Sequence, residues 1–339
     1  MMERAAGELQ RSVDDGLVAA AVMYVVQRDQ VFARAFGTAA SEQAMFLLGS
    51  ISKPICVTAL MTLYDRGAFQ LDDPLRKFIP QFTGDGRDDV TIRHLLTHVS
   101  GLPDQVADNL QLRQRHAPLA EFVDHAIRTP LGFRPGTQYE YSSMAILLAA
   151  RVAELISGLE IRTLVAQAVF APLKMEHSAQ GLGPFQLSEM VPLQTERAAP
   201  ESGGGDPQAK DWDWNSFYWR SLGAPWGGTH ASAVDLAAWI GEFLDERGEV
   251  LSPATARLMI ANANPTGLQP RGLGWDVGPE AGSRGCSVQT FGHNGSTGTL
   301  AWADPATRTI CLVLTSLPAA AVDPHPRQLA ADRIAAAVV

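Results

Sequence analysis

An apolar segment with helical spacing follows Ser50-Ile51-Ser52-Lys53, and it restricts the fold more than any other feature of this sequence. The apolar positions of the segment are Pro54, Ile55, Val57, Leu60, Met61 and Leu63. Their spacing predicts a helix that closes at Arg66-Gly67, and Pro54 suits the first turn, which places the helix start within a residue or two of Ser52. Ser50 is therefore expected at the helix N-terminus, where free backbone N–H groups and the helix dipole favour negative charge.

Ser50 and Lys53 form the first candidate catalytic pair, because they are one helical turn apart. Side chains three positions apart share a helix face, with about 5–6 Å between their Cβ atoms, so the Lys53 amine can reach the Ser50 oxygen. A serine hydroxyl is a weak nucleophile until a base takes its proton, and burial beside the positive helix end lowers the pKa of a lysine enough for this role. The alternative is structural, with Ser50 as a helix cap and Lys53 as a surface cation.

Two further segments can carry chemistry. Tyr141 stands just before a predicted helix from Met144 to Ile156. A tyrosine there can shuttle protons if nearby cations stabilise its phenolate, although packing is the alternative role for a single tyrosine. Near the C-terminus, Phe291 to Thr299 and the segments after it predict β-strands joined by turns, with glycines that let a ligand approach the backbone of an edge strand.

Taken in order, these segments resemble the serine hydrolases related to class C β-lactamases, D-Ala-D-Ala carboxypeptidases and lactamase-like (family VIII) esterases. The resemblance covers nearly the whole chain. One phrase, TIRHLLTHVSGL at Thr91 to Leu102, is similar to the family's TIRHLLTHTSGL signature. The other phrases that carry the resemblance are Gly49 to Pro54, Leu71 to Pro74, Pro135-Gly136 through Tyr141-Ser142, Gly227-Gly228, and Gly292 to Gly295.

The resemblance implies a role for several residues. Ser50 is expected to be acylated, and Lys53 and Tyr141 are expected to handle protons. The backbone N–H groups of Ser50 and Ser296 are expected to form the oxyanion hole. Loss of one preorganised oxyanion donor typically lowers kcat by about 10²–10³, so the backbone geometry at Ser296 should matter as much as many side chains.

The sequence departs from the family at two positions near the expected substrate. Efficient β-lactamases of the family usually carry Lys at the first position of the edge-strand triad, whereas here His293 precedes Gly295 and no lysine follows Lys210. An imidazole has a reference pKa of about 6.5, so it is mostly neutral at neutral pH. Ser143 stands where the family usually has Asn after Tyr-Ser, and its shorter hydroxyl changes how a substrate amide is recognised.

Both departures favour hydrolysis of esters or small amides over destruction of penicillins. The predicted function is therefore a serine hydrolase that forms an acyl-enzyme with a small-molecule ester, amide or lactam, with weak β-lactam turnover as a side activity. Within the family, the alternatives are a β-lactamase and a D-aminopeptidase or carboxypeptidase-type peptidase. The alternative of another class is a catalytically silent binding protein on the same fold. No cofactor is expected.

A metal site is the competing interpretation of His94-Leu95-Leu96-Thr97-His98, because two histidines four positions apart share one face of a helix. Zinc hydrolases with this spacing need a glutamate beside the first histidine as general base, and here that position holds Leu95. A third ligand is also missing from the pattern. We therefore expect no metal, with His94 and His98 bonded to local backbone groups or packed in the core.

Composition narrows the partners and the compartment. The formal charge of −9 argues against a nucleic-acid or anionic-membrane partner. The segment from Met1 to Gly16 predicts an amphipathic helix and has no hydrophobic signal core, so a cytoplasmic location is expected. The three cysteines, Cys56, Cys286 and Cys311, lack paired spacing and are expected to be buried free thiols.

The patterns predict an α/β (α+β) protein: an antiparallel sheet made from both chain ends, flanked by helices and resembling the β-lactamase/transpeptidase fold. Residues 1–66 and 225–339 are expected to form the sheet domain, and 67–224 an inserted all-helical domain. The cleft between them is the expected active site. The predicted strands are 17–27, 31–36, 45–48, 272–277, 288–293, 300–303 and 309–315, and the further predicted helices are 91–98, 119–128, 161–169, 232–247 and 326–338.

Six aromatic residues crowd between Trp212 and Trp226, after a glycine-rich loop at 201–210. As a functional wall, Trp214, Trp219 and Trp226 would line an apolar pocket for the acyl or alcohol part of a substrate. The alternative is that the rings pin the long loop to the helical domain.

Overall fold

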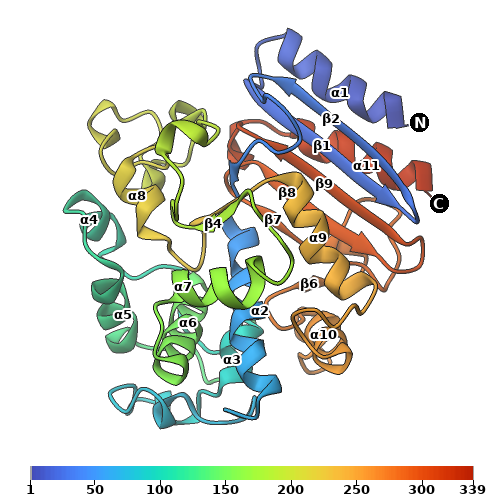
Figure 1. The fold of residues 1–339 in the computed structure, drawn as a ribbon. Helices are drawn as coiled ribbons and strands as arrows, with labels where there is room; N and C mark the ends of the chain where they lie inside the picture. Colours follow the sequence, from blue (N-terminus) through green and yellow to red (C-terminus); the bar gives the residue numbers. More distant parts are fainter. Residues whose placement is uncertain (1, 339) are drawn as a thin grey trace.

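The fold is built on a six-stranded antiparallel sheet in a computed structural model that describes residues 2–338 (Figure 1). The strand order is β2-β1-β9-β8-β7-β6, so the first two strands of the chain pair with the last four of this sheet, as predicted. The bounds are β1 (Ala20–Gln27), β2 (Gln30–Gly37), β6 (Asp276–Val277), β7 (Phe291–Gly295), β8 (Thr299–Asp304) and β9 (Thr309–Thr315).

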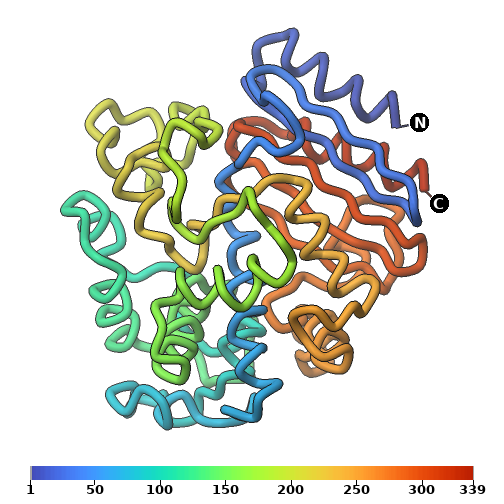
Figure 2. The backbone as a smooth tube through the Cα atoms, in the orientation of Figure 1, coloured from blue at the N-terminus to red at the C-terminus, as the bar shows by residue number. Residues whose placement is uncertain are grey.

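Helices cover both faces of this sheet. Helices α1 (Met2–Asp14) and α11 (Pro326–Val338) pack on one face, where Leu9 and Ile334 belong to one buried cluster with sheet residues such as Met23. Helix α9 (Ala233–Leu244) packs on the other. Because both faces are covered, every residue of β8 and β9 is buried. Figure 2 shows that the two ends of the chain run side by side in the outer layer.

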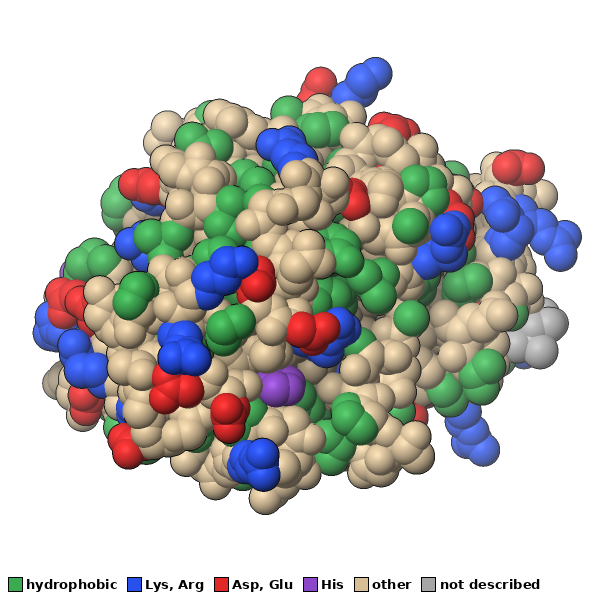
Figure 3. All heavy atoms as spheres, turned by 90° about the horizontal axis from the view of Figure 1, so that it is seen from below, with side chains coloured by type: hydrophobic (Ala, Val, Ile, Leu, Met, Phe, Trp, Pro, Cys, Tyr) green, Lys and Arg blue, Asp and Glu red, His purple; other side chains and the backbone are tan. Residues whose placement is uncertain are grey.

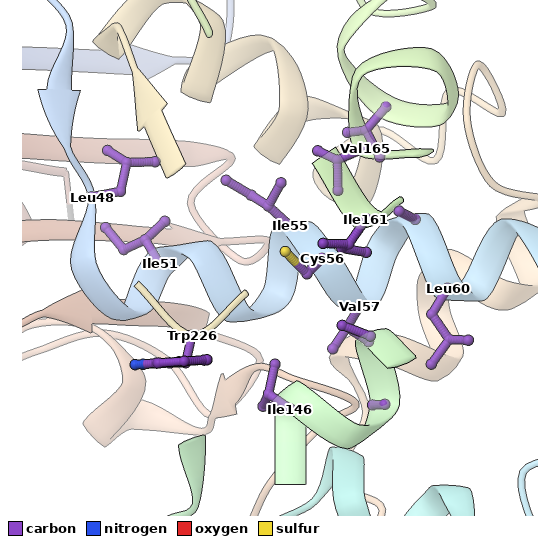
Figure 4. Packing of buried hydrophobic residues seen from close by; sticks show 14 of the residues in the cluster. Leu48, Ile51, Ile55, Cys56, Val57, Leu60, Ile146, Ile161, Val165 and Trp226 are labelled. Carbon is purple, nitrogen blue, oxygen red and sulfur yellow. The ribbon is translucent and has the colours of Figure 1, made fainter. Parts of the chain in front are cut away.

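Helix α2 (Ser52–Asp65) lies between the sheet and the helical region and is buried from Ser52 through Leu63. In Figure 4, Ile55, Cys56 and Val57 of this helix lie among Ile146 and Ile161 from two neighbouring helices. The remaining α-helices are α3 (Ile92–Leu96), α4 (Asn109–Gln114), α5 (Leu119–Arg128), α6 (Ser143–Ser157), α7 (Ile161–Val165), α8 (Phe217–Leu222) and α10 (Pro253–Ile260). The helical region of 67–224 is visible in Figure 1, and its exact division from the sheet domain stays a prediction.

A second, three-stranded sheet of order β3-β5-β4 corrects two parts of the prediction. It consists of β3 (Phe46–Leu47), β5 (Thr229–Ala231) and β4 (Ser178–Gln180). β4 lies inside the segment predicted to be helical throughout, and β5 was not predicted. Strands of three residues carry too little alternation to be seen in a sequence, and they form here because their partners lie across the core.

Several other bounds differ from the prediction. The strand predicted from Val288 begins at Phe291, and Val288 itself is exposed. The helix predicted over 161–169 is α-helical to Val165 and continues as a π-helical turn to Phe170. The strand predicted over 272–277 is reduced to β6, because Gly274 has a left-handed backbone (φ 82°) that interrupts an extended chain.

Three further observations concern the surface, the length of the helices and the cysteines. On the face in Figure 3, acidic and basic side chains are interspersed. Over residues 2–338, we find no helix with the combined length and apolar character that a bilayer crossing requires. The three cysteines are free thiols, and Cys286 is partly exposed rather than buried as predicted.

Candidate active site

The structure joins Ser50 and Lys53 directly. Ser50 lies in a 3₁₀ turn (Gly49–Ile51) that leads into α2, and Nζ of Lys53 donates a hydrogen bond of 2.9 Å to its Oγ. Nζ also donates to the backbone oxygen of Trp226 at 3.0 Å. The Lys53 side chain is 1% exposed, so it is not the surface cation of the structural alternative.

Burial changes the chemistry of this lysine. Removal from water disfavours the ammonium form and lowers the pKa of Lys53 to about 7, the nearby charge of Asp104 opposes this shift, and the charge of Arg271 adds to it. A large fraction of the Lys53 side chains therefore carries a free amine at neutral pH. That amine lies within hydrogen-bond distance of a serine oxygen, which is the arrangement an activated nucleophile requires.

Tyr141 completes the group next to Ser50. It directly precedes Ser142, the N-cap of α6, whose hydroxyl accepts a hydrogen bond from the backbone N–H of Ala145 at 3.0 Å. Nζ of Lys53 lies 4.7 Å from the centroid of the Tyr141 ring. Burial raises the pKa of Tyr141, and the charge of Arg271 and a hydrogen bond with Ser50 only partly oppose this. Tyr141 is therefore a neutral phenol at neutral pH.

The turn after β7 lies against the turn that holds Ser50. Gly49 has a φ of 58°, and a Cβ at this position would lie 2.9 Å from Oγ1 of Thr297 and 3.1 Å from the backbone nitrogen of Ser296. The hydroxyl of Thr297 donates to the backbone oxygen of Leu47 at 2.7 Å, which fixes the two turns to each other. The two turns can approach each other this closely because residue 49 is a glycine.

A cavity of about 230 Å³ contains most of the predicted site residues. Its lining includes Ser50, Lys53, Tyr141, Ser143, Trp214, Trp219, Trp226 and Ser296. A larger hollow of about 1030 Å³ lies in the helical region between α5, α6 and α8, and its lining holds none of these residues. The smaller cavity is therefore the candidate active site, because it holds the serine and its base.

His293 and Gly295, which were predicted to bind substrate, are not among the residues that line this cavity. His293 is 3% exposed, and its Nδ1 lies 2.9 Å from the backbone oxygen of Asn294. Burial and the charge of Arg271 hold the pKa of His293 well below its usual value, so the imidazole is neutral. A Cβ at Gly295 would lie 2.1 Å from the backbone oxygen of Leu48, so this glycine serves close packing of the strand.

Two charged residues at the site were not predicted. Asp104 accepts hydrogen bonds from both the backbone N–H and the hydroxyl of Ser143, at 2.8 and 2.6 Å. Arg271 lies with its Cζ 5.5 Å from the centroid of the Tyr141 ring. Asp104 lies two residues after the phrase that ends at Leu102 and could have been considered, whereas Arg271 belongs to a loop without any motif.

The prediction that His94 and His98 share a helix face is wrong. Helix α3 ends at Leu96, and His98 has a left-handed backbone with a φ of 60°. Nδ1 of His94 accepts a hydrogen bond from the backbone N–H of Thr91 at 3.3 Å, and Nδ1 of His98 accepts one from Ser142 at 3.1 Å. Both histidines therefore bond to backbone groups, which are local for His94, as expected, and 44 positions away for His98.

The aromatic residues divide between two roles. Trp214, Trp219 and Trp226 line the cavity, as the functional interpretation proposed. Trp212 is buried outside the lining and Phe217 is 68% exposed. The hydroxyl of Tyr218 donates to the backbone oxygen of Ala117 at 2.8 Å, which pins α8 to the segment before α5.

Comparison with known proteins gives matches along the whole chain. The family model described as Beta-lactamase matches residues 4–336. The chain is 34% identical to "Esterase EstB" of Burkholderia gladioli over 157 residues, which is 42% of this chain and 40% of the esterase, so the match spans less than half the length of that relative. It is 24% identical to a "Putative D-alanyl-D-alanine carboxypeptidase" of Escherichia coli (strain K12) over 91% of this chain and 81% of the relative.

Solved structures show the same fold. "EstCE1, a hydrolase with promiscuous acyltransferase activity" superposes with a TM-score of 0.78 at 21% identity, covering 98% of each chain. The D-amino acid amidase from Ochrobactrum anthropi SV3, complexed with D-phenylalanine, superposes with a TM-score of 0.78 at 20% identity, covering 99% of each chain. These similarities support the predicted sheet-and-helix architecture.

Proposed function

Because the chain belongs to the Beta-lactamase family, whose members include esterases, carboxypeptidases and amidases, and is therefore a serine hydrolase, we propose that it cleaves carboxylic esters or small amides through an acyl-enzyme on Ser50. The observation that carries this proposal is the hydrogen bond of 2.9 Å between Lys53 and Ser50, both of which line the cavity. A buried amine with a pKa near 7 beside a serine oxygen has no structural purpose that a neutral side chain would not serve better.

The first step is the attack of Ser50 Oγ on the substrate carbonyl carbon. The neutral amine of Lys53 takes the hydroxyl proton as the new Oγ–C bond forms. The negative charge on the carbonyl oxygen is stabilised by the backbone N–H groups of Ser50 and Ser296, which belong to the two adjoining turns. Preorganised donors of this kind need no reorganisation at the moment when the charge develops.

The second step releases the alcohol or amine. The bond between the carbonyl carbon and the leaving atom breaks, and the neutral phenol of Tyr141 gives its proton to the leaving atom. Lys53 then passes the proton that it took from Ser50 to Tyr141. Water then attacks the acyl-enzyme, and the same groups return the proton to Ser50 Oγ as the carboxylic acid leaves. The raised pKa of Tyr141 keeps its phenol protonated at neutral pH, so Tyr141 holds a proton to give and Lys53 is the base.

The substrate class follows from what lies in the cavity. Three tryptophans supply apolar surface for the acyl or alcohol part of a substrate. The position after Tyr-Ser holds Ser143, which donates its hydroxyl proton to Asp104, so it cannot also donate to a substrate amide oxygen as a carboxamide would. These features favour esters and small amides, with weak turnover of β-lactams as a side activity.

The proposal is tested with Ser50→Ala. This variant should lose both hydrolysis of a short-chain p-nitrophenyl ester and covalent labelling by a fluorophosphonate. Ser188→Ala, which alters an exposed serine, is the control and should retain both. A Ser50→Ala protein that is fully active would refute the proposal. A parallel screen of D-amino-acid amides and a chromogenic cephalosporin separates the esterase from the peptidase and lactamase alternatives.

A further inference from the structure

The wall of the cavity formed by α4 and α8 contains polar groups that have no partner. The carboxamide oxygen of Asn109, Nε of Arg113 and Nε1 of Trp219 are buried and form no hydrogen bond within residues 2–338. All three residues line the same cavity as Ser50, and their side chains are 6%, 5% and 2% exposed. Buried polar groups are nearly always hydrogen-bonded, so unpaired groups that converge on a cavity indicate a place for a polar ligand.

Arg113 is the charged member of this group. Its guanidinium lies on the Trp219 ring, with Cζ 3.7 Å from the ring centroid. Of its five N–H donors, one is used within the described residues, from Nη1 to the backbone oxygen of Glu201 at 3.1 Å. The stacking holds the guanidinium in one plane while leaving donors free, which suits recognition of a planar anion.

No carboxylate of residues 2–338 forms an ion pair with Arg113. Glu201 contacts it through the backbone oxygen, and its exposed carboxylate, which also lines the cavity and acts on the charge of Arg113, forms no ion pair with it. Asp104 also lines the cavity, but its Oδ1 is taken by Ser143 and its charge acts on Lys53. Burial lowers the pKa of Arg113 only to about 10, so it is a cation at neutral pH. An unpaired buried cation is costly for stability, which points to a ligand as its counter-ion.

We propose that Arg113, Asn109 and Trp219 form a subsite for a carboxylate group of the substrate, so that the preferred esters or amides are anionic. Asn109 lies four positions before Arg113 on the same face of α4, so its amide nitrogen can donate to the same carboxylate, whereas its unpaired oxygen is an acceptor and suits an N–H or O–H of the substrate. The guanidinium fork matches two carboxylate oxygens, and Nε1 of Trp219 can donate to one of them. A cavity of about 230 Å³ suits a small carboxylate. This inference rests on the proposed function, because it names the substrate class of that same site.

The test compares three chromogenic esters. p-Nitrophenyl butyrate is neutral, p-nitrophenyl hemisuccinate carries a carboxylate on the acyl part, and 4-acetoxy-3-nitrobenzoate carries it on the leaving group. We expect kcat/KM for one of the two anionic esters to exceed that for the neutral ester by about 10-fold or more, since hydrogen bonds to charged groups contribute factors of about 10–100. The preferred ester shows on which side of the scissile bond the carboxylate lies.

Arg113→Met should reduce the ratio of kcat/KM for the anionic ester to kcat/KM for the neutral ester to about one. Arg113→Lys should retain part of the wild-type preference. The matched control is Arg115→Met, which removes an exposed arginine of the same segment that pairs with Glu121, and it should leave the ratio unchanged. A wild-type protein without preference for either anionic ester overturns the proposal. So does an Arg113→Met protein that keeps the wild-type ratio.

A binding measurement separates failure of the subsite from failure of the catalytic proposal. With Ser50→Ala protein, monomethyl succinate should bind at least about 10-fold more tightly than dimethyl succinate by calorimetry, and the added Arg113→Met change should remove the difference. This result would support the subsite even if no ester were hydrolysed. Equal binding of the two compounds would overturn the subsite. It would not contradict the proposed esterase activity of the wild-type protein, which is tested separately.

Discussion

The guanidinium of Arg271 donates a hydrogen bond to Nε2 of His293, with Nη2 lying 2.9 Å from that nitrogen. His293 therefore accepts at Nε2 and donates from Nδ1 to the backbone oxygen of Asn294, which fixes it as the neutral Nδ1–H tautomer. Arg271 is 2% exposed and also pairs with Asp276. Arg271, which belongs to a loop, thus places a buried cation next to both His293 and Tyr141.

Arg271→Met should move the acidic limb of the activity profile to higher pH. The charge of Arg271 lowers the pKa of Lys53, so its removal raises that pKa and reduces the free amine at neutral pH. We expect a shift of about one pH unit and a fall of up to about tenfold in kcat/KM at pH 7. The measurement is kcat/KM for a neutral ester from pH 5 to 10. Arg308→Met, which alters an exposed arginine paired with Asp245, is the control, and an unmoved limb in Arg271→Met would contradict the argument.

The wild-type protein should show a single rising limb centred near pH 7. Lys53 has a pKa lowered to about 7, so below that pH the ammonium cannot accept the proton of Ser50 and kcat/KM falls about tenfold per unit. Tyr141 has a raised pKa and stays protonated, so we expect no descending limb below about pH 10. Lys53→Ala should lower kcat by about 10²–10⁴, whereas Lys77→Ala, at an exposed lysine, should not. A flat wild-type profile from pH 5 to 9 would exclude Lys53 as the base.

Asp104→Asn should shift the same limb in the opposite direction. The carboxylate of Asp104 raises the pKa of Lys53, so the neutral carboxamide should lower that pKa and extend activity to lower pH by about one unit. The asparagine oxygen can still accept the N–H of Ser143, so the local fold is retained. Asp108→Asn, at an exposed carboxylate beside His125, serves as the control. If Asp104→Asn moved the limb upward, the assigned electrostatic role would be wrong.

The helices and strands whose segments have a strong hydrophobic periodicity were predicted correctly from the sequence. The bounds of α5 (Leu119–Arg128), β9 (Thr309–Thr315) and α11 (Pro326–Val338) agree with the prediction. The spacing of Ser50 and Lys53 likewise predicted their contact, because three positions at a helix start leave little freedom. Such features depend on residues that are close in the sequence, so the sequence alone indicates them.

Features that depend on distant contacts were not predictable. Strand β4 forms because it pairs with β5, some 50 residues away, and neither has enough residues for a recognisable alternation. Arg271 reaches Tyr141 across about 130 positions, and no pattern marks its loop. His98 was assigned to a helix by spacing, yet its backbone turns left-handed so that Nδ1 meets the N–H of Ser142. In each case the tertiary partner decides the local conformation.

Gly49→Ala should lower kcat by about 10²–10³ with a smaller change in KM. The added Cβ would lie 2.9 Å from Oγ1 of Thr297 and 3.1 Å from the backbone nitrogen of Ser296, so the turn carrying that N–H must move. Gly67→Ala is a matched control, because Gly67 has a similar φ of 74° with no atom within 4 Å of its added Cβ. It should cost a similar amount of stability and leave kcat unchanged. Equal kcat values in the two variants would argue against an oxyanion role for Ser296.

Trp214→Ala should alter the dependence of kcat/KM on ester chain length. Trp214 lines the cavity, so its removal widens the space for the acyl or alcohol part and should change the ratio between long and short esters by about tenfold. Trp212→Ala is the comparison that separates this effect from general destabilisation. Trp212 is as well buried as Trp214, at 4% against 6% exposed, but lies outside the cavity lining. Its loss should lower the melting temperature and leave the chain-length ratio unchanged, and parallel profiles in the two variants would show that the tryptophans only hold the loop.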